Sequence, residues 1–553
     1  MDEKTPIADQ DGWGEMTSEA IQAILIANAV RSYPYRHPFF RRLYLIGFVI
    51  VTLLILLPAW SLLYIPIKNR PRSQWTLKQC LRVRFSRRLC GLVARCELDS
   101  LGRDLATDLD PIKLKHSHPV TIPPAPPRML RGHPKDTLDQ LHVSRGRWIP
   151  RFIHRNDRGK QGIWGRWNEE EDGKVYGFDD VKAFWYTGEK SATEEAETDA
   201  TSNIPKALVK HSPIHHILSV DYRLAPTAPW PLPLLDAISA YYWLVKVEGV
   251  EESDIIVAGD SAGGHLALTL TRWLRDEGGD VGVGLPRGMV LMSPWADLGF
   301  TNAWGDEAIK HNKDCDTIDD TFGPFACALL LRALPAEIMH TSPYISPASL
   351  LIPSSVNGQY SFENFPATYI VYGGAERLST NIQLLWNRIR RSRELVKPII
   401  SDRAFVSPDG VHDFMIFPWM AEEASEVYED LDVWLRQLLS ADLPEEDEQS
   451  VAESLELEED ESSWREMIRQ RRLTRQMTRE SIKSHKSPVM GPVRDDLGMM
   501  RMMEDMSEEG LSMITTDLFI PKSPEWLTPL TSDLRPDYGM DDDEIPWYDL
   551  DAG

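Results

Sequence analysis

The sequence has few of the residues that crosslink or glycosylate secreted proteins. Its cysteines number only five, and none of them stands in Cys-x-x-Cys spacing, so neither a disulfide framework nor a zinc site is indicated. No Asn-x-Ser/Thr sequon for N-linked glycosylation occurs in the 553 residues. Both absences favour a protein that faces the cytosol.

The chain also lacks the excess of positive charge that is typical of nucleic-acid binding. It holds 84 acidic and 60 basic residues, a formal net charge of −24, which argues against nucleic acid as a partner. Residues 441–553 contain 29 acidic and 12 basic residues, and so supply 17 of the 24 negative charges. This segment has no apolar periodicity, so we expect an acidic, disordered tail. The pattern leaves open whether the tail binds protein partners or is simply solvated.

One long stretch carries no charge at all. From Leu43 to Ile67 the sequence LYLIGFVIVTLLILLPAWSLLYIPI is apolar, and about 20 such residues suffice to cross a bilayer. It begins too far from Met1, and is too long, for a cleaved signal peptide. We therefore expect an N-terminal segment over 1–42 and a single transmembrane helix over 43–67. Basic residues flank the helix on both sides and are more numerous after it, which favours a cytosolic location for the rest of the chain.

The remaining sequence divides into a connector and an alternating body. Residues 68–144 form a juxtamembrane, cap and connector region that includes the proline-rich run PVTIPPAPPRML. From 145 to 440, short apolar runs alternate with helical patterns. Candidate strands lie at 181–186, 216–223, 254–260, 288–295, 367–374 and 396–402, and candidate helices at 231–246, 265–278 and 378–392. This alternation predicts an α/β fold with a mostly parallel sheet between helices, whose chemistry gathers at the carboxyl ends of the strands.

The stretch IIVAGDSAGGHLAL places Ser261 at the end of a strand and the start of a helix. Gly259 and Gly263 flank it, as a strained strand-to-helix turn requires, because neighbouring backbones come too close for side chains. The amide of Ala262 and the helix N-terminus would then face negative charge that develops on a substrate. A Gly-x-Ser-x-Gly pattern alone is weak evidence, but this context predicts that Ser261 is a nucleophile.

Two further residues follow later strands in the order that this kind of site requires, with the acid before the histidine. Glu376 comes after the strand ATYIVYGG, 115 residues beyond Ser261, and His412 lies after the last strand, 36 residues further on. In such a site the carboxylate orients the imidazole, and the imidazole takes the proton of the serine. We therefore predict that Ser261, Glu376 and His412 form a catalytic triad.

These residues belong to motifs that carry a family likeness. The motifs are GDSAGG (259–264), DYRLAP (221–226), MSPWADL (292–298), GGAERL (373–378) and GVHDF (410–414). Over roughly 145–440 the chain resembles the hormone-sensitive-lipase-like branch of the α/β-hydrolases, and within it is similar to membrane-anchored fungal steryl acetyl hydrolases and arylacetamide deacetylases. The resemblance implies an α/β-hydrolase fold with a small cap, and a carboxylic ester hydrolase of the endoplasmic reticulum membrane that uses no metal or organic cofactor.

The family pattern is broken at one point. The family carries a His-Gly-Gly-Gly motif after its third strand, whose amides form most of the oxyanion hole. Here the strand KAFWY is followed at once by TGEKSATEEAE, as though a short piece were missing between Tyr186 and Thr187. Gly188 remains as a substitute donor beside Ala262. Loss of one such donor commonly costs about 100- to 1,000-fold in rate.

Three interpretations of this gap stay open. The chain is an esterase whose loop supplies other amides, or a catalytically impaired hydrolase fold that binds a ligand or acts as an adaptor, or the product of a gene-prediction error. The apolar segment FGPFACALLLRALPAEIMH (322–340) either lines an acyl pocket or packs on the sheet. An apolar cover beside a membrane helix favours a lipophilic ester, such as an acetylated sterol or a short acylglycerol, as the substrate.

Overall fold

The computed structural model describes most of the chain between residues 34 and 440. The described residues are 34–35, 37–96, 117–143, 148–150, 164–166, 177–187, 203–225, 228–299, 311–331, 334–335, 337–352, 362–394 and 402–440. The acidic tail expected over 441–553 lies outside them, as does the N-terminal segment up to residue 33.

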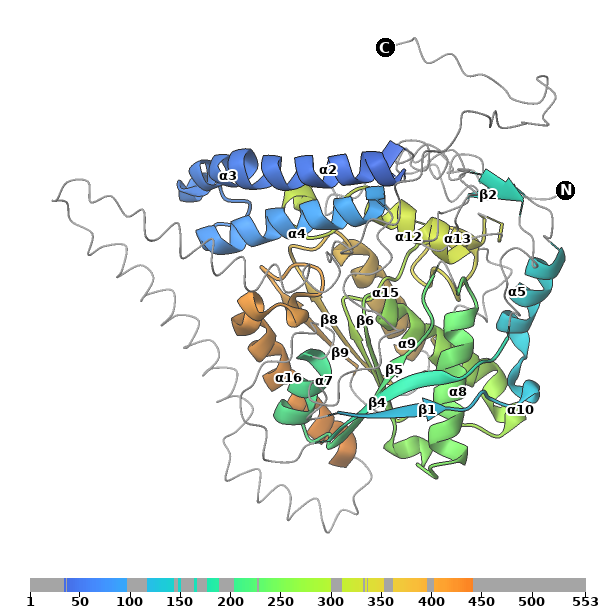
Figure 1. Cartoon of the computed structure of the whole chain (residues 1–553). Helices are drawn as coiled ribbons and strands as arrows, with labels where there is room; N and C mark the ends of the chain where they lie inside the picture. Colours follow the sequence, from blue (N-terminus) through green and yellow to red (C-terminus); the bar gives the residue numbers. More distant parts are fainter. Residues whose placement is uncertain are drawn as a thin grey trace, which may run out of the picture.

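Four short strands form a parallel sheet in the order β6, β7, β8, β9. They span Ile256–Asp260, Gly288–Met292, Ala367–Gly373 and Arg403–Ser407. Every residue of β7 and β8 is buried, as expected for apolar strands that are covered on both faces. Figure 1 shows this sheet in the interior with helices on both sides, and the parallel arrangement predicted from the sequence is confirmed.

The last strand begins later than the sequence pattern predicts. The pattern indicates a strand at 396–402, whereas β9 begins at Arg403. Of the predicted segment, only Asp402 is among the described residues. β9 is an edge strand with partly buried side chains, so it lacks the continuous apolar run that marks β7 and β8.

Two predicted strands join a different ladder from the one expected. β4 (Val181–Thr187) and β5 (His216–Asp221) pair antiparallel with each other, and β4 also pairs antiparallel with β1 (Ser117–Ile122). β5 is only partly buried along most of its length, which suits an antiparallel ladder with one less covered face. β1 comes from the region assigned to a connector. A separate two-stranded ladder joins β2 (Trp148–Pro150) and β3 (Trp164–Arg166).

Alternate residues of the parallel strands build two separate cores, because successive side chains of a strand point to opposite faces. Met289 and Leu291 of β7 pack with α9 (Ala262–Trp273) and α15 (Ser379–Glu394) on one face. Val290 and Met292 pack on the other face with α16 (Ala421–Ser440) and α7 (Asn203–His211).

A third core cluster lies between α9 and α8 (Leu232–Lys246), and it includes Cys327 and Leu331 of α12 (Phe322–Leu331). The predicted helices at 231–246, 265–278 and 378–392 therefore correspond to α8, α9 and α15, and a π-helical turn at Leu274–Gly278 extends α9. Further α-helices within the described part of the body are α5 (Gly132–Val143), α10 (Gly279–Val281), α12 (Phe322–Leu331) and α13 (Ile338–Thr341).

The apolar stretch forms one continuous helix over Pro38–Tyr64, long and apolar enough to cross a membrane. It consists of α2 (Pro38–Val51), a π-helical turn (Thr52–Leu56) and α3 (Leu57–Tyr64). The π turn ends two residues before Pro58, whose ring has no N–H to donate to the preceding turn. The next helix, α4 (Leu77–Cys96), packs against both this helix and the body.

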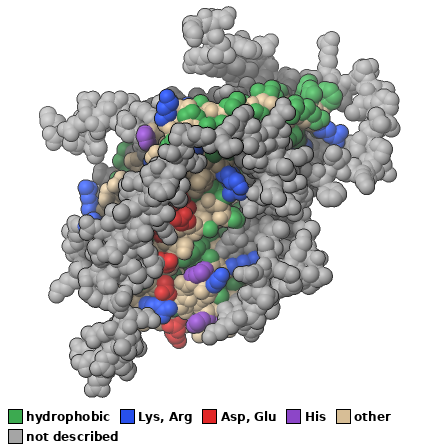
Figure 2. Space-filling view, turned by 90° about the vertical axis from the view of Figure 1, so that its left-hand side faces the viewer, with side chains coloured by type: hydrophobic (Ala, Val, Ile, Leu, Met, Phe, Trp, Pro, Cys, Tyr) green, Lys and Arg blue, Asp and Glu red, His purple; other side chains and the backbone are tan. Residues whose placement is uncertain are grey.

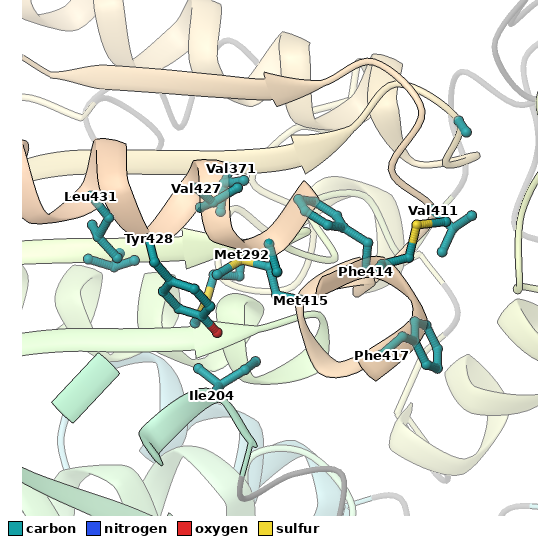
Figure 3. Close-up of a cluster of buried hydrophobic side chains, with 14 of the residues drawn as sticks. Ile204, Met292, Val371, Val411, Phe414, Met415, Phe417, Val427, Tyr428 and Leu431 are labelled. Carbon is teal, nitrogen blue, oxygen red and sulfur yellow. The ribbon is translucent and has the colours of Figure 1, made fainter. Parts of the chain in front are cut away.

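The C-terminal helix fixes the loop that carries His412. Figure 3 shows Val427, Tyr428 and Leu431 of α16 packed with side chains from β7, β8 and the segment after His412. Val411 and Phe414, on either side of the histidine, are buried in this cluster. Burial of α16 therefore positions the last candidate site residue as well as stabilising the sheet.

We predict that Leu431→Ala destabilises the protein by about 2–5 kcal/mol, because it removes a fully buried side chain and leaves a cavity. The change in the free energy of unfolding can be measured by urea denaturation followed by tryptophan fluorescence. Leu439→Ala, on the same helix but 37% exposed, is the matched control. Equal effects of the two substitutions would contradict the packing described for α16.

Candidate active site

Ser261 stands on the turn between β6 and α9, and its backbone is strained. Its φ is 49° and its ψ is −112°, and a positive φ is costly for any residue except glycine. The glycines make the turn possible, since a Cβ on Gly259 would lie 2.2 Å from the carbonyl oxygen of Gly263. The amide of Ser261 donates to the carbonyl of Met292 at 2.9 Å, and the amide of Trp295 donates to the carbonyl of Ser261 at 3.0 Å. These bonds hold the hydroxyl at the carboxyl edge of the sheet.

His412 and Glu376 reach Ser261 from two other loops. Nε2 of His412 lies 2.8 Å from Oγ of Ser261, and Nδ1 of His412 lies 3.0 Å from Oε2 of Glu376. Glu376 is fully buried, and its other oxygen accepts a hydrogen bond from the amide of Gly373 at 3.0 Å. The structure thus brings together the hydroxyl, the imidazole and the carboxylate that the sequence singles out, in that order.

Burial and neighbouring charges shift the pKa values of Glu376 and His412 in opposite directions. Burial raises the pKa of Glu376 to about 7, although the contact with His412 acts in the opposite direction. For His412, burial alone disfavours the imidazolium, but the carboxylates of Asp413 and Glu376 outweigh it and hold the pKa well above its usual value. The arrangement therefore favours a positive charge on the imidazole.

Asp413 is a second carboxylate at the imidazole. Its Oδ2 lies 3.1 Å from Nε2 of His412, the same nitrogen that faces Ser261. The residue has a φ of 53°, and among the described residues its buried Oδ1 has no hydrogen-bond partner. A carboxylate at Nε2 attracts an N–H but repels a lone pair, so Asp413 favours the protonated imidazole over the neutral one.

Asp316, which the sequence analysis does not identify, forms hydrogen bonds to both the Glu376 loop and the His412 loop. Its buried carboxylate accepts hydrogen bonds from the amides of His412 at 3.0 Å, Arg377 at 2.8 Å and Thr317 at 2.7 Å. Hydrogen bonds to an ionised acceptor are stronger than those between neutral groups. Asp316 stands in no recognised motif and is far from its partners in sequence, so only the fold reveals its position beside the site.

The segment between α3 and α4 also contacts both loops. Nη2 of Arg72 donates to the carbonyl of Gly374 at 2.8 Å and to Oδ1 of Asn312 at 2.7 Å. The side-chain nitrogen Nδ2 of Asn312 donates to the carbonyls of Gly374 and Glu376. Nε1 of Trp75 donates to the carbonyl of Asp409, in the loop before His412. The N-terminal helices are thus connected to the acid and histidine loops by direct hydrogen bonds.

The two predicted oxyanion donors have different outcomes. Ala262 is the first residue of α9, and amides of a first helical turn have no partner inside the helix. The role of its N–H group as an oxyanion donor stays a prediction. Gly188 lies outside the described residues.

No group of three or more histidine, cysteine, aspartate or glutamate side chains within the described residues is arranged to hold a metal ion. The five cysteines are all free thiols.

Residues 193–415 match a family model described as an α/β hydrolase fold. Over 124 residues, the chain is 36% identical to a protein named esterase from Acinetobacter venetianus, which covers 22% of this chain and 35% of that protein. Over 226 residues it is 27% identical to esterase LipU of Mycobacterium tuberculosis, covering 40% of this chain and 67% of that protein. A solved esterase described as a member of the bacterial hormone-sensitive lipase family is 25% identical, with a TM-score of 0.35 and coverage of 46% of this chain and 82% of that one.

Residues 193–415 therefore form an α/β-hydrolase domain, and the chain is similar to esterases and to hormone-sensitive lipase. The likeness seen in the motifs is confirmed, and the match spans about a third of the length of the first of these relatives. In the hydrolase domain, the DYRLAP motif has a structural role: Nε and Nη2 of Arg223 donate to the buried carboxylate of Asp236 at 2.6–3.0 Å.

We predict that Asp316→Ala lowers kcat for ester hydrolysis by about 10- to 100-fold, because small displacements of positioned catalytic groups carry penalties of this size. KM should change little, because Asp316 contacts the backbone amides of the acid and histidine loops and is not proposed to contact the substrate. The control is Asp254→Ala, which removes an exposed carboxylate away from the acid and histidine loops. Steady-state kinetics of the two variants decides, and an Asp316→Ala enzyme with unchanged kcat would contradict the positioning role.

We also predict that Asp413→Asn moves the acidic limb of the pH profile of kcat/KM to lower pH. In the predicted triad the imidazole must be neutral to accept the proton of Ser261, and the Asp413 carboxylate raises the pKa of His412. Without this charge, the neutral form persists at lower pH. Rates measured across the pH range test the shift. A limb that stays in place or moves to higher pH would exclude the electrostatic effect of Asp413.

Proposed function

We propose that this protein is a carboxylic ester hydrolase that uses Ser261 as nucleophile, His412 as general base and Glu376 as the acid that orients the histidine. The observation that carries the proposal is the continuous contact from the Ser261 hydroxyl through both nitrogens of His412 to Glu376, at 2.8 and 3.0 Å. The strained turn that presents Ser261 supports the same role, because strain of this kind concentrates at catalytic serines.

In this mechanism, Nε2 of His412 takes the proton of Ser261 as the hydroxyl oxygen attacks the ester carbonyl. The tetrahedral intermediate collapses to an acyl-enzyme when the imidazolium gives its proton to the leaving alcohol. Water then attacks the acyl-enzyme with the same base, and releases the acid. Glu376 holds the proton at Nδ1 and stabilises the imidazolium in both halves of the reaction.

The oxyanion is stabilised by the amide of Ala262 and by further donors from the segment after β4, for which the sequence offers Gly188. Because the His-Gly-Gly-Gly motif is missing, we expect slower turnover than in relatives that keep it. This missing motif also supports a second candidate function, a catalytically impaired hydrolase fold that binds a lipophilic ligand or recruits partners through its acidic tail.

The proposed substrate is a lipophilic ester with a short acyl group, such as an acetylated sterol or a short acylglycerol. The support is the apolar helix Pro38–Tyr64, whose neighbouring turn contacts the loops of Glu376 and His412. Further support comes from α12, an apolar helix that contacts α4 and is fully buried on only one side. Attachment to a membrane, of which the endoplasmic reticulum is our candidate, would supply such esters at high local concentration. The weak positive-inside signal favours a domain on the cytosolic face.

We predict that the wild-type chain hydrolyses p-nitrophenyl acetate and cholesteryl acetate, and that Ser261→Ala lowers kcat by about 1,000-fold or more. Release of p-nitrophenol and of sterol measures the two reactions. Ser253→Ala, at an exposed serine outside the site, is the control. Saturable binding of cholesteryl acetate without turnover in the wild type would favour the binding alternative over the enzyme. Turnover of water-soluble acetates alone would contradict the lipophilic substrate.

A further inference from the structure

The apolar helix Pro38–Tyr64 lies against the hydrolase domain. Figure 1 shows α2 and α3 running along α4 on one side of the molecule. The face that meets α4 carries Tyr44, Phe48, Thr52, Leu57 and Tyr64, all buried or partly buried. The π-helical turn at Thr52–Leu56 inserts an extra residue between Thr52 and Leu57, which keeps both on the same face.

Arginines of α4 donate hydrogen bonds to hydroxyl groups along this helix pair. The pairs are Arg84 with Tyr64 at 2.6 Å, Arg88 with Thr52 at 2.8 Å and Arg95 with Tyr44 at 3.3 Å. The partner's number falls as the arginine's number rises, so the helices form an antiparallel hairpin. The guanidinium of Arg88 also lies 4.4 Å from the centre of the Phe48 ring, a favourable cation–π distance.

The other side of α4 packs on the domain. Its Cys80, Leu81 and Val83 are buried in the cluster that also contains β8 and α16. Nη1 of Arg84 forms a 2.9 Å ion pair with Asp314, and Nη1 of Arg87 donates to the carbonyl of Ile318 at 2.7 Å. α4 is therefore held between the apolar helix and the domain.

The outward face of the apolar helix is exposed and almost entirely hydrophobic. Leu43, Ile46, Ile50 and Leu54 follow one another at helical spacing along this face, and Leu62 continues it; Leu54 is 71% and Leu62 72% exposed. Hydrophobic side chains gather along the upper edge of the molecule in Figure 2. Exposed Arg42 and Lys68 lie near the two ends of the stripe. An exposed apolar stripe of this length is stable only where it contacts another apolar surface, such as the acyl chains of a lipid layer.

The contacts with α4 conflict with an orientation in which the same helix crosses a bilayer. Thr52 is near the middle of the 27-residue helix, so a spanning orientation would bring its partner Arg88 to the centre of the hydrocarbon. Charged side chains are very unfavourable there. If the apolar helix entered the bilayer without α4, all three arginine–hydroxyl pairs would break, and the partly apolar surface of α4 would be exposed to water.

We propose that the Pro38–Tyr64 helix lies flat in one leaflet of a lipid bilayer, with Leu43, Ile46, Ile50, Leu54 and Leu62 among the acyl chains and α4 facing the domain. The described residues before and after this helix are then on the same side of the membrane, in contrast to the single-pass arrangement expected from the sequence alone. The turn that holds Arg72 and Trp75 brings the Glu376 and His412 loops close to the lipid surface, and this last consequence rests on the proposed function.

Protease protection of the full chain tests the topology. We would place one epitope tag before Met1 and another after Gly553, and treat intact microsomes with protease. The in-plane helix predicts that both tags share one fate, both digested or both protected. Digestion of one tag with protection of the other would overturn the proposal, and this readout does not depend on catalytic activity.

Vesicle flotation tests the surface itself. Ile46→Glu combined with Leu54→Glu should lower the fraction of full-length protein that floats with phosphatidylcholine vesicles by about tenfold or more, because two apolar side chains that would lie among the acyl chains are replaced by charges. The matched control is Val247→Glu, which changes a side chain of the hydrolase domain that is 59% exposed. Circular dichroism establishes that both variants fold.

Unchanged flotation of the double variant would overturn the proposal. So would a double variant that loses only self-association, measured by analytical ultracentrifugation in detergent, because the stripe would then bind a second copy of the chain.

Discussion

The structure depends on the convergence of three loops at the carboxyl edge of one parallel sheet. The hydroxyl of Ser261 is held in a strained turn that is feasible only because Gly259 has no side chain. His412 lies 2.8 Å from it, and Glu376 lies 3.0 Å behind the histidine. Neither loop is fixed by its own sequence. Each is fixed by the burial of neighbouring residues and by hydrogen bonds to groups elsewhere in the chain.

Those hydrogen bonds extend from the site to the N-terminal helices. Asp316 joins the acid and histidine loops through their amides, and Arg72 and Trp75 contact the same loops from the turn between α3 and α4. The apolar helix and α4 are thus connected by direct contacts to the edge of the sheet that carries Ser261. A helix that lies in a lipid surface would, through these contacts, hold the site beside the phase in which lipophilic esters dissolve.

Short sequence patterns predicted the parts of the fold that depend on neighbouring residues in the chain, such as buried strands and tight turns. Continuous apolar runs indicated β7 and β8 because both faces of these strands are buried, and the glycines around Ser261 indicated the strained turn. The order of Glu376 and His412 along the chain was sufficient to single them out. By contrast, β9 is partly exposed and starts after its predicted position, and β1 lies in a proline-rich stretch that resembles a connector. Asp316 and Arg72 act through backbone groups that are distant in sequence, and no residue pattern marks such contacts.

The most direct test is to map where a fluorophosphonate attaches to the full chain, by peptide mass spectrometry. The reagent reacts only with a serine whose proton is removed by a neighbouring base. We expect one adduct, on the peptide that contains Ser261, and its loss when His412 is replaced by alanine. No adduct on that peptide, or an adduct that persists without His412, would contradict the account.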